Sequence, residues 1–149
     1  MRSVCGDRRG VTGREVVTPT YRALVGGVAT GEILHLVEPL SLWGGLDPAT
    51  GQLIDRNHPQ AGQSLTGRIV VMPHGRGSSS SSSVLAEALR LGTAPAGFIL
   101  GEPDAILVVG ALVATRLYSA SCPIVCGPAP AARAGIWRID QNQVTPLPG

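Results

Sequence analysis

The sequence predicts an α/β fold in which short strands outnumber helices. Short apolar runs alternate with turn residues along the chain, which contains 20 Gly and 12 Pro. Hydrophobic residues make up 44% of the 149 residues and charged residues only 15%, so there is enough apolar material for one core. The order of strand, Gly-rich loop and helix is clearest in residues 69–91.

The prediction is organised around residues 72–84, in which Met-Pro-His-Gly-Arg-Gly is followed by six serines and a valine. We expect a buried central strand over Thr66–Met72, because its second half is continuously apolar. The amphipathic run that follows predicts a helix from about Ser82 to Leu91, ended by Gly92 and Pro95. Helical spacing assigns four residues to its buried face: Val84, Leu85, Ala88 and Leu89.

The loop between this strand and helix is a candidate site. Backbone N–H groups at a helix start lack intrahelical partners, and the helix dipole adds positive potential there. Arg76 adds a full positive charge, and Ser78 is the first hydroxyl after the second glycine. The place therefore suits an anion or a developing negative charge. The stretch matches neither a phosphate-binding P-loop nor a dinucleotide fingerprint.

A flexible serine linker is the competing interpretation of this loop. We favour the site, because segments with regular periodicity adjoin the serines on both sides. A second alternative suits the later serines better than Ser78. In it Ser81, Ser82 or Ser83 simply starts the helix as an N-cap.

The rest of the chain predicts further strands and one more helix. The first two strands are expected over Tyr21–Val28, with a bulge or bend at Gly26-Gly27, and over Glu32–Val37. Buried strands, part of a parallel arrangement with the first helix as crossover, are expected over Ala96–Leu100 and Ala105–Val109. The remaining expected elements are a helix over Gly110–Leu117, a short strand over Pro123–Val125, and a hairpin of Ile136–Asp140 and Val144–Leu147 around Gln141-Asn142.

A second candidate region is the Gly-rich loop over residues 40–58. It contains Trp43, Gly44-Gly45, Asp47, Asp55 and His58, which together suit one wall of a site. Structural roles compete with this interpretation. Either aspartate is equally suited to bonding its own turn backbone, and a single histidine is more often structural than a ligand.

Composition excludes several classes of protein. The net charge is +2 and no basic patch is interleaved with aromatics, which argues against a nucleic-acid partner. No apolar run approaches the ~20 residues of a membrane span, and the N-terminus lacks the apolar core of a secretory signal.

Residues 1–19 are polar and Arg-rich, so we expect a loose tail before a single domain over residues 20–149. Three cysteines make no disulfide framework, and the favoured interpretation of Cys122 and Cys126 is buried, reduced thiols in a cytoplasmic protein.

Several motifs in order resemble one known family. They are residues 39–51 (PLSLWGGLDPATG), 54–59 (IDRNHP), 75–79 (GRGSS) and Ala94-Pro95. This set is similar to the swivel domain of aconitase X proteins, and the resemblance runs from about Tyr21 to about Val125. It implies a swivelling β/β/α domain as in aconitases. It also implies a small subunit whose large partner holds the iron or iron–sulfur centre, with no metal bound by this chain.

The resemblance further implies a hydro-lyase, a dehydratase subunit inactive without its partner. Known activities of the family remove water from mevalonate 5-phosphate or from cis-3-hydroxy-L-proline. The serine that acts as base in the family corresponds to Ser78. We predict that the anionic substrate is bound by the neighbouring loop residues Arg76, Gly77, Ser79 and His74. Ser81 stands where Gly is common in the family.

Two alternatives from other classes remain at this point. Phosphohistidine carrier domains use a similar swivelling architecture, and His74 beside a Gly/Ser loop would be the carrier. A non-catalytic binding module that keeps the fold is the other. The pattern from Trp43 to His58 has no place in the carrier interpretation.

Overall fold

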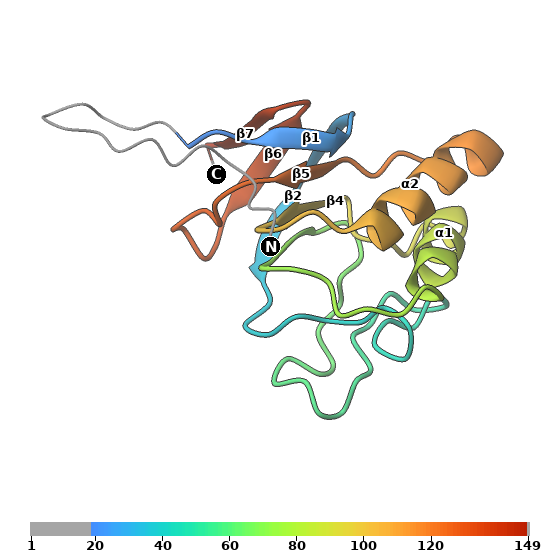
Figure 1. Ribbon diagram of the computed structural model, residues 1–149. Helices are drawn as coiled ribbons and strands as arrows, with labels where there is room; N and C mark the ends of the chain where they lie inside the picture. Colours follow the sequence, from blue (N-terminus) through green and yellow to red (C-terminus); the bar gives the residue numbers. More distant parts are fainter. Residues whose placement is uncertain (1–18, 149) are drawn as a thin grey trace, which may run out of the picture.

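The computed structural model describes residues 19–148, so the predicted tail lies almost wholly outside the described residues. A seven-stranded sheet forms the centre, and two helices cover one of its faces (Figure 1). The elements are β1 Arg22–Val25, β2 Val28–His35, β3 Ile69–Met72, α1 Ser81–Leu91, β4 Gly97–Leu100, α2 Ala105–Tyr118, β5 Ile124–Cys126, β6 Ile136–Asp140 and β7 Gln143–Pro146.

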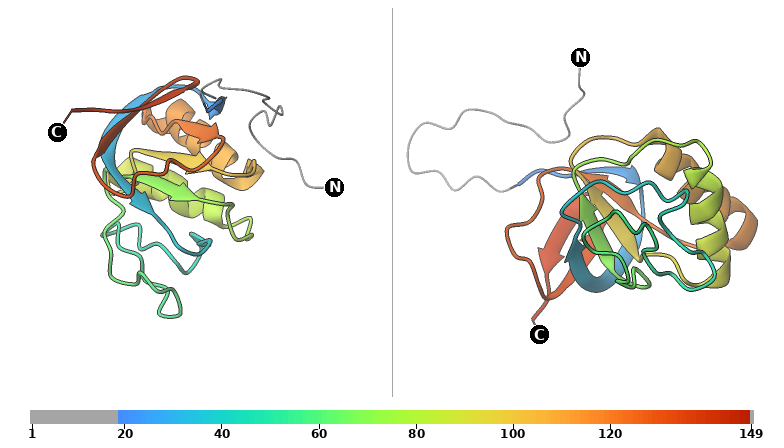
Figure 2. Two further views of the ribbon diagram at one scale, coloured as in Figure 1. Left: turned by 90° about the vertical axis from the view of Figure 1, so that its left-hand side faces the viewer. Right: turned by 90° about the horizontal axis from the view of Figure 1, so that it is seen from below.

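The strand order is β1-β5-β4-β3-β2-β6-β7. Strands β2, β3, β4 and β5 are parallel neighbours, whereas β1, β6 and β7 join the two edges in antiparallel fashion. The long strand β2 pairs with β6 through its first five residues and with β3 through its last three. The sheet therefore curls, as Figure 2 shows from two further directions.

Each face of the sheet covers its own core. Leu85, Ala88, Leu107 and Ala111 of the helices pack on one face, together with leucines of the loop between β2 and β3. The β6–β7 hairpin closes the other face, where Ile139 packs among side chains of the parallel strands. Because β3 is buried on both faces, all four of its residues are apolar and buried. The predicted α/β class is confirmed, and so are the central strand, the first helix and the C-terminal hairpin.

The boundary between the first two strands differs from the prediction. The chain breaks at Gly26-Gly27, and β2 then runs without interruption from Val28 to His35. Gly27 has a φ of +143°, which a glycine adopts without strain. Its N–H donates to Oε1 of Gln141 at 3.2 Å, so the β6–β7 turn holds this corner in place.

The strand predicted over Ala105–Val109 is wrong, because these residues form the first turns of α2. Asp104 is the N-cap, and its Oδ1 accepts from the N–H groups of Ile106 at 2.9 Å and Leu107 at 3.1 Å. A short apolar run does not distinguish a buried strand from a buried helix. The cap residue decides here in favour of the helix.

The two cysteines of the apolar C-terminal segment differ from each other. Cys122 is free and fully buried, as expected, and burial raises the pKa of its thiol to about 12. Cys126 is disulfide-bonded, so the expectation of reduced thiols is wrong for that residue. No helix among residues 19–148 is long and apolar enough to cross a membrane.

Candidate active site

The candidate site is the loop of residues 73–80, which leaves β3 at the carboxyl edge of the parallel strands and enters α1. The neighbouring strand β4 ends at the same edge, where the N–H of Gly101 donates to the carbonyl of Met72 at 3.2 Å. Open α/β sheets bind their ligands at this edge, because the loops after parallel strands gather there. Figure 1 shows the loop running from the sheet to the start of α1.

Ser78 is half-buried in this loop, between the exposed residues Gly77 and Ser79. Its carbonyl accepts a hydrogen bond from the N–H of Ser81 at 2.9 Å. Within residues 19–148, no hydrogen bond engages its hydroxyl. The side chain of Ser78 is therefore available for chemistry, whereas its backbone is tied to the helix.

The unpaired backbone N–H groups lie one turn earlier than the sequence suggests. The first N–H groups of α1, from Ser81, Ser82 and Ser83, donate to the carbonyls of Ser78, Ser79 and Ser80. These N–H groups lack intrahelical partners, as expected, but loop carbonyls occupy them, because the loop closes onto the helix in tight turns. In the described part of the chain, the N–H groups of residues 77–80 have no acceptor. They are the donors that an anion would use.

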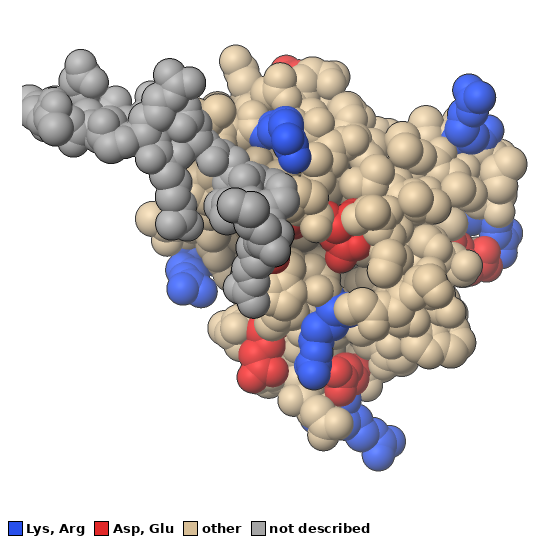
Figure 3. Space-filling view, in the orientation of Figure 1, with Lys and Arg blue, Asp and Glu red and all other residues tan. Residues whose placement is uncertain are grey.

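Two features of this place favour an anion, and one carboxylate, that of Asp104, lies against Gly75. The first turn of α1 contains no acidic residue, and the N-cap Ser80 makes no side-chain cap. The helix dipole is consequently not offset by a carboxylate of α1. Arg76 is exposed, and its guanidinium forms no ion pair within residues 19–148. Figure 3 shows that few charges interrupt the surface over the helices, most of which is uncharged.

His74 is half-buried, and its Nδ1 lies 2.8 Å from the carbonyl oxygen of Gly75. A carbonyl only accepts, so Nδ1 carries a hydrogen and donates to it. Nε2 is then the nitrogen available to a ligand. The ring of His74 thus bonds the backbone of its own loop.

One part of the predicted wall lies beside the serine loop. The N–H of Arg76 donates to the carbonyl of Leu40 at 3.4 Å, and the N–H of Trp43 donates to Oγ of Ser81 at 3.1 Å. Trp43 is 61% exposed at the tip of a turn, next to Gly44 with a φ of +77°. The backbone of an exposed tryptophan therefore lies next to the start of α1.

The other residues of that wall have structural roles. Oδ1 of Asp47 accepts from the N–H of Ala49, and Oδ1 of Asp55 accepts from the N–H of Asn57, each at 2.9 Å. His58 is buried, with Nε2 3.0 Å from the carbonyl oxygen of Glu38 and Nδ1 accepting from the N–H of Gln60. These contacts are structural. They agree with the alternative interpretation of the sequence, in which the aspartates belong to turns and the histidine to the edge of the core.

The sequence reasoning missed Asp104. Its carboxylate, which caps α2, lies against Gly75 in the space that a Cβ would occupy. Position 75 therefore accepts only glycine without displacing the cap. The sequence does contain a sign of this role: Asp104 stands directly before an apolar run, a pattern that is typical of a helix start.

The described residues do not form a metal site. Among residues 19–148, no three His, Cys, Asp or Glu side chains are grouped so that they could hold an ion. The loop offers hydroxyls, amides and a guanidinium, which are groups that bind anions. An arrangement of this kind can bind a carboxylate or phosphate and stabilise an alkoxide.

Comparison with known proteins identifies the family. The family model of the aconitase X swivel domain matches residues 18–145. The chain belongs to this family. The resemblance noted in the sequence and the swivelling β/β/α fold that it implied are thereby confirmed.

Relatives of this swivel domain occur alone and within longer chains. The cis-3-hydroxy-L-proline dehydratase of Pseudomonas aeruginosa is 50% identical over 105 residues, which are 70% of this chain and 18% of the relative. The phosphomevalonate dehydratase small subunit of Methanopyrus kandleri is 48% identical over 82 residues, which are 55% of this chain and 61% of the relative. The chain thus spans less than a fifth of the first relative and about three fifths of the second.

Solved structures show the same fold. The crystal structure of Thermococcus kodakaraensis aconitase X in its holo-form has a chain that superimposes with a TM-score of 0.77 at 33% identity. The match covers 87% of the swivel domain described here and 98% of that chain. A UPF0107 protein solved by solution NMR matches with a TM-score of 0.74 at 29% identity over the same shares.

Proposed function

We propose that this chain is the small, swivel component of an aconitase X-type hydro-lyase, active only with a large partner subunit. The observation that carries the proposal lies at the carboxyl edge of the sheet. There the hydroxyl of Ser78 and the neighbouring backbone N–H groups make no hydrogen bond within residues 19–148. The relatives that are named dehydratases support the reaction class.

Ser78 is the proposed base. A dehydration breaks a C–H bond and the C–O bond of the neighbouring carbon, forms a C=C bond, and releases hydroxide. In the proposed step, Ser78 first loses its hydroxyl proton, which combines with the released hydroxide to give water, and the resulting alkoxide takes the proton from carbon. A serine hydroxyl is a weak base, so its ionised form needs stabilisation. We assign this stabilisation to the loop N–H groups and Arg76, in a cleft closed by the partner.

The substrate is a small anion held by the same loop. We assign Arg76, Gly77, Ser79 and His74 to substrate binding, with the guanidinium and the loop N–H groups facing a carboxylate or phosphate. Both mevalonate 5-phosphate and cis-3-hydroxy-L-proline carry such a group. The selecting contacts come largely from the partner subunit, so either substrate fits this loop.

The cofactor is assigned to the partner. Residues 19–148 offer no ligand set for iron or for an iron–sulfur cluster. We therefore derive no step of this chain through a metal, and the departure of hydroxide is left to groups of the large subunit.

Co-expression with the large aconitase X-type subunit tests the proposal. The purified complex should dehydrate one of the two substrates, measured by loss of substrate and gain of the alkene product, while each subunit alone is inactive. A panel that contains both substrates decides between them. A stable complex that dehydrates neither would overturn the assigned substrates, and failure of the subunits to co-purify would overturn the partner.

A further inference from the structure

Ser81 is an unusual first residue for a helix, because its hydroxyl is buried. It is 4% exposed, and its side chain turns away from the helix to the turn at Trp43. The N-cap of α1 is Ser80, so Ser81, at the first helical position, is not the residue expected to cap the helix. Here the hydroxyl bonds a different part of the chain, so capping does not explain it.

The hydrogen bonds around Trp43 close into a ring. The N–H of Trp43 donates to Oγ of Ser81 at 3.1 Å, and Oγ of Ser41 donates to the carbonyl of Trp43 at 3.3 Å. The two hydroxyls lie 3.4 Å apart. Since the hydrogen of Ser41 is used on the carbonyl, Ser81 must donate to Ser41. Each hydroxyl then gives one bond and accepts one, an arrangement in which the bonds strengthen one another.

The backbone of Ser81 bonds the candidate base. Its N–H donates to the carbonyl of Ser78 at 2.9 Å, while its hydroxyl accepts from Trp43. A single residue therefore joins the serine loop to the turn that carries the exposed indole. The two loops come from distant parts of the sequence, and this residue fixes their relative position.

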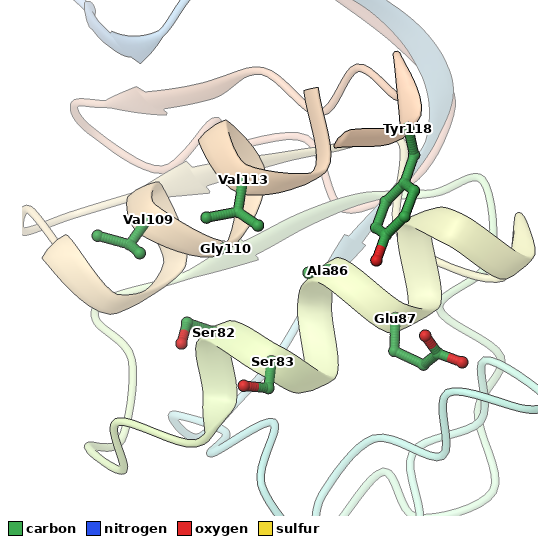
Figure 4. A pocket seen from close by; sticks show the side chains of 8 residues that line it. All are labelled: Ser82, Ser83, Ala86, Glu87, Val109, Gly110, Val113 and Tyr118. Atoms are coloured by element: carbon green, nitrogen blue, oxygen red, sulfur yellow. The ribbon is translucent and has the colours of Figure 1, made fainter. Parts of the chain in front are cut away.

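The next residue of α1 is held from the opposite side. Gly110 of α2 approaches the backbone of Ser82 so closely that a Cβ at position 110 would lie 2.7 Å from the carbonyl oxygen of Ser82. Figure 4 shows Ser82 and Gly110 facing each other at one end of the groove between the helices. The start of α1 is thus closely packed on α2 at Ser82, while Ser81 bonds the Trp43 turn.

We infer that Ser81 is a positioning residue. Its hydroxyl holds the Trp43 turn against the Ser78 loop, a link called the clip below, so that the indole of Trp43 and the hydroxyl of Ser78 are presented together. The catalytic consequence rests on the proposed function, whereas the clip itself does not. Loss of the hydroxyl frees the N–H of Trp43, while its carbonyl keeps the bond from Ser41, and it leaves Ser78 bonded to a helix start that no longer holds the Trp43 turn.

Amide hydrogen exchange of the full chain, followed by NMR, tests the clip without the partner. Ser81→Ala should speed the exchange of the Trp43 N–H by about fivefold to tenfold, because one hydrogen bond of a local structure is lost. Ser41→Ala should give a smaller rise at the same amide. Ser83→Ala is the matched control, since Ser83 is exposed in the same turn and its hydroxyl makes no hydrogen bond within residues 19–148. Unchanged Trp43 exchange in a folded Ser81→Ala protein overturns the clip.

Kinetics of the assembled enzyme test its consequence. Ser81→Ala should lower kcat by about tenfold and change KM little, because the base is displaced while the anion donors of the loop remain. Ser83→Ala should match wild type. If Ser78→Ala is inactive but Ser81→Ala keeps the wild-type kcat, the positioning role is overturned. If Ser78→Ala is itself fully active, the proposed base fails instead, and the exchange experiment alone decides on the clip.

Discussion

The carboxylate of Asp104 occupies the space beside Gly75 that any larger residue would need. The same carboxylate caps α2 by accepting from the N–H groups of Ile106 and Leu107. A helix cap and the first glycine of the serine loop are therefore packed against each other. This contact joins α2 to the loop of the candidate base.

Gly75→Ala should consequently destabilise the protein by about 1–3 kcal/mol, because its Cβ must displace a bonded carboxylate. Gly77→Ala is the matched control two residues away. A Cβ there meets no atom within 4 Å, so its effect should stay within about 0.5 kcal/mol. Urea unfolding of the full chain measures both. In an Asp104→Ala background the cost of Gly75→Ala should fall, and equal costs in the two backgrounds would contradict the contact.

Ser78→Ala should fold and bind the proposed large subunit normally but lower kcat by at least about 100-fold, because the proposed base is removed. Arg76→Lys keeps the charge and loses the planar fork, so a smaller loss is expected. Ser79→Ala is the control and should be mild. Steady-state kinetics of the complex measure these effects. Near wild-type turnover by Ser78→Ala would move the base to the partner.

The large subunit should cover the turn at Trp43. The indole is 61% exposed beside the candidate site, and large exposed aromatics are typical anchors of protein interfaces. Hydrogen exchange by mass spectrometry should show slower exchange of residues 40–47 in the complex than in the free chain. Equal exchange in both samples would place the interface elsewhere. Trp43→Ala should weaken the complex by at least about tenfold if the indole is an anchor.

Cys122 should resist alkylation in the native protein. Burial raises the pKa of its thiol from 9.0 to about 12, so the reactive thiolate is scarce at pH 8 and iodoacetamide has no access. Peptide mapping should find Cys122 unlabelled in native protein and labelled in urea. The folded state holds this proton more tightly than the unfolded state, so the contribution of Cys122 to stability is complete below about pH 9. It is lost as pH rises toward 12. Rapid native labelling would contradict the buried placement.

Local patterns determined much of the architecture. The continuous apolar run before the serine loop specified a strand buried on both faces, and the 3.6-residue period after it specified α1. The glycines and the serine that follow them marked the candidate site, and the ordered motifs marked the family. These features are recorded in neighbouring residues, so no knowledge of distant contacts is needed to find them.

Contacts between distant residues decided the rest. The apolar run at Ala105 is a helix, because Asp104 caps it and α1 packs against it. The free N–H donors lie before α1 and not within it, because the loop carbonyls bend back onto the helix start. Ser81 serves the Trp43 turn, 38 residues earlier in the chain, rather than its own helix. A hydroxyl or an amide can bond any of several acceptors that lie close to it in the sequence. Only the packed chain selects one of them.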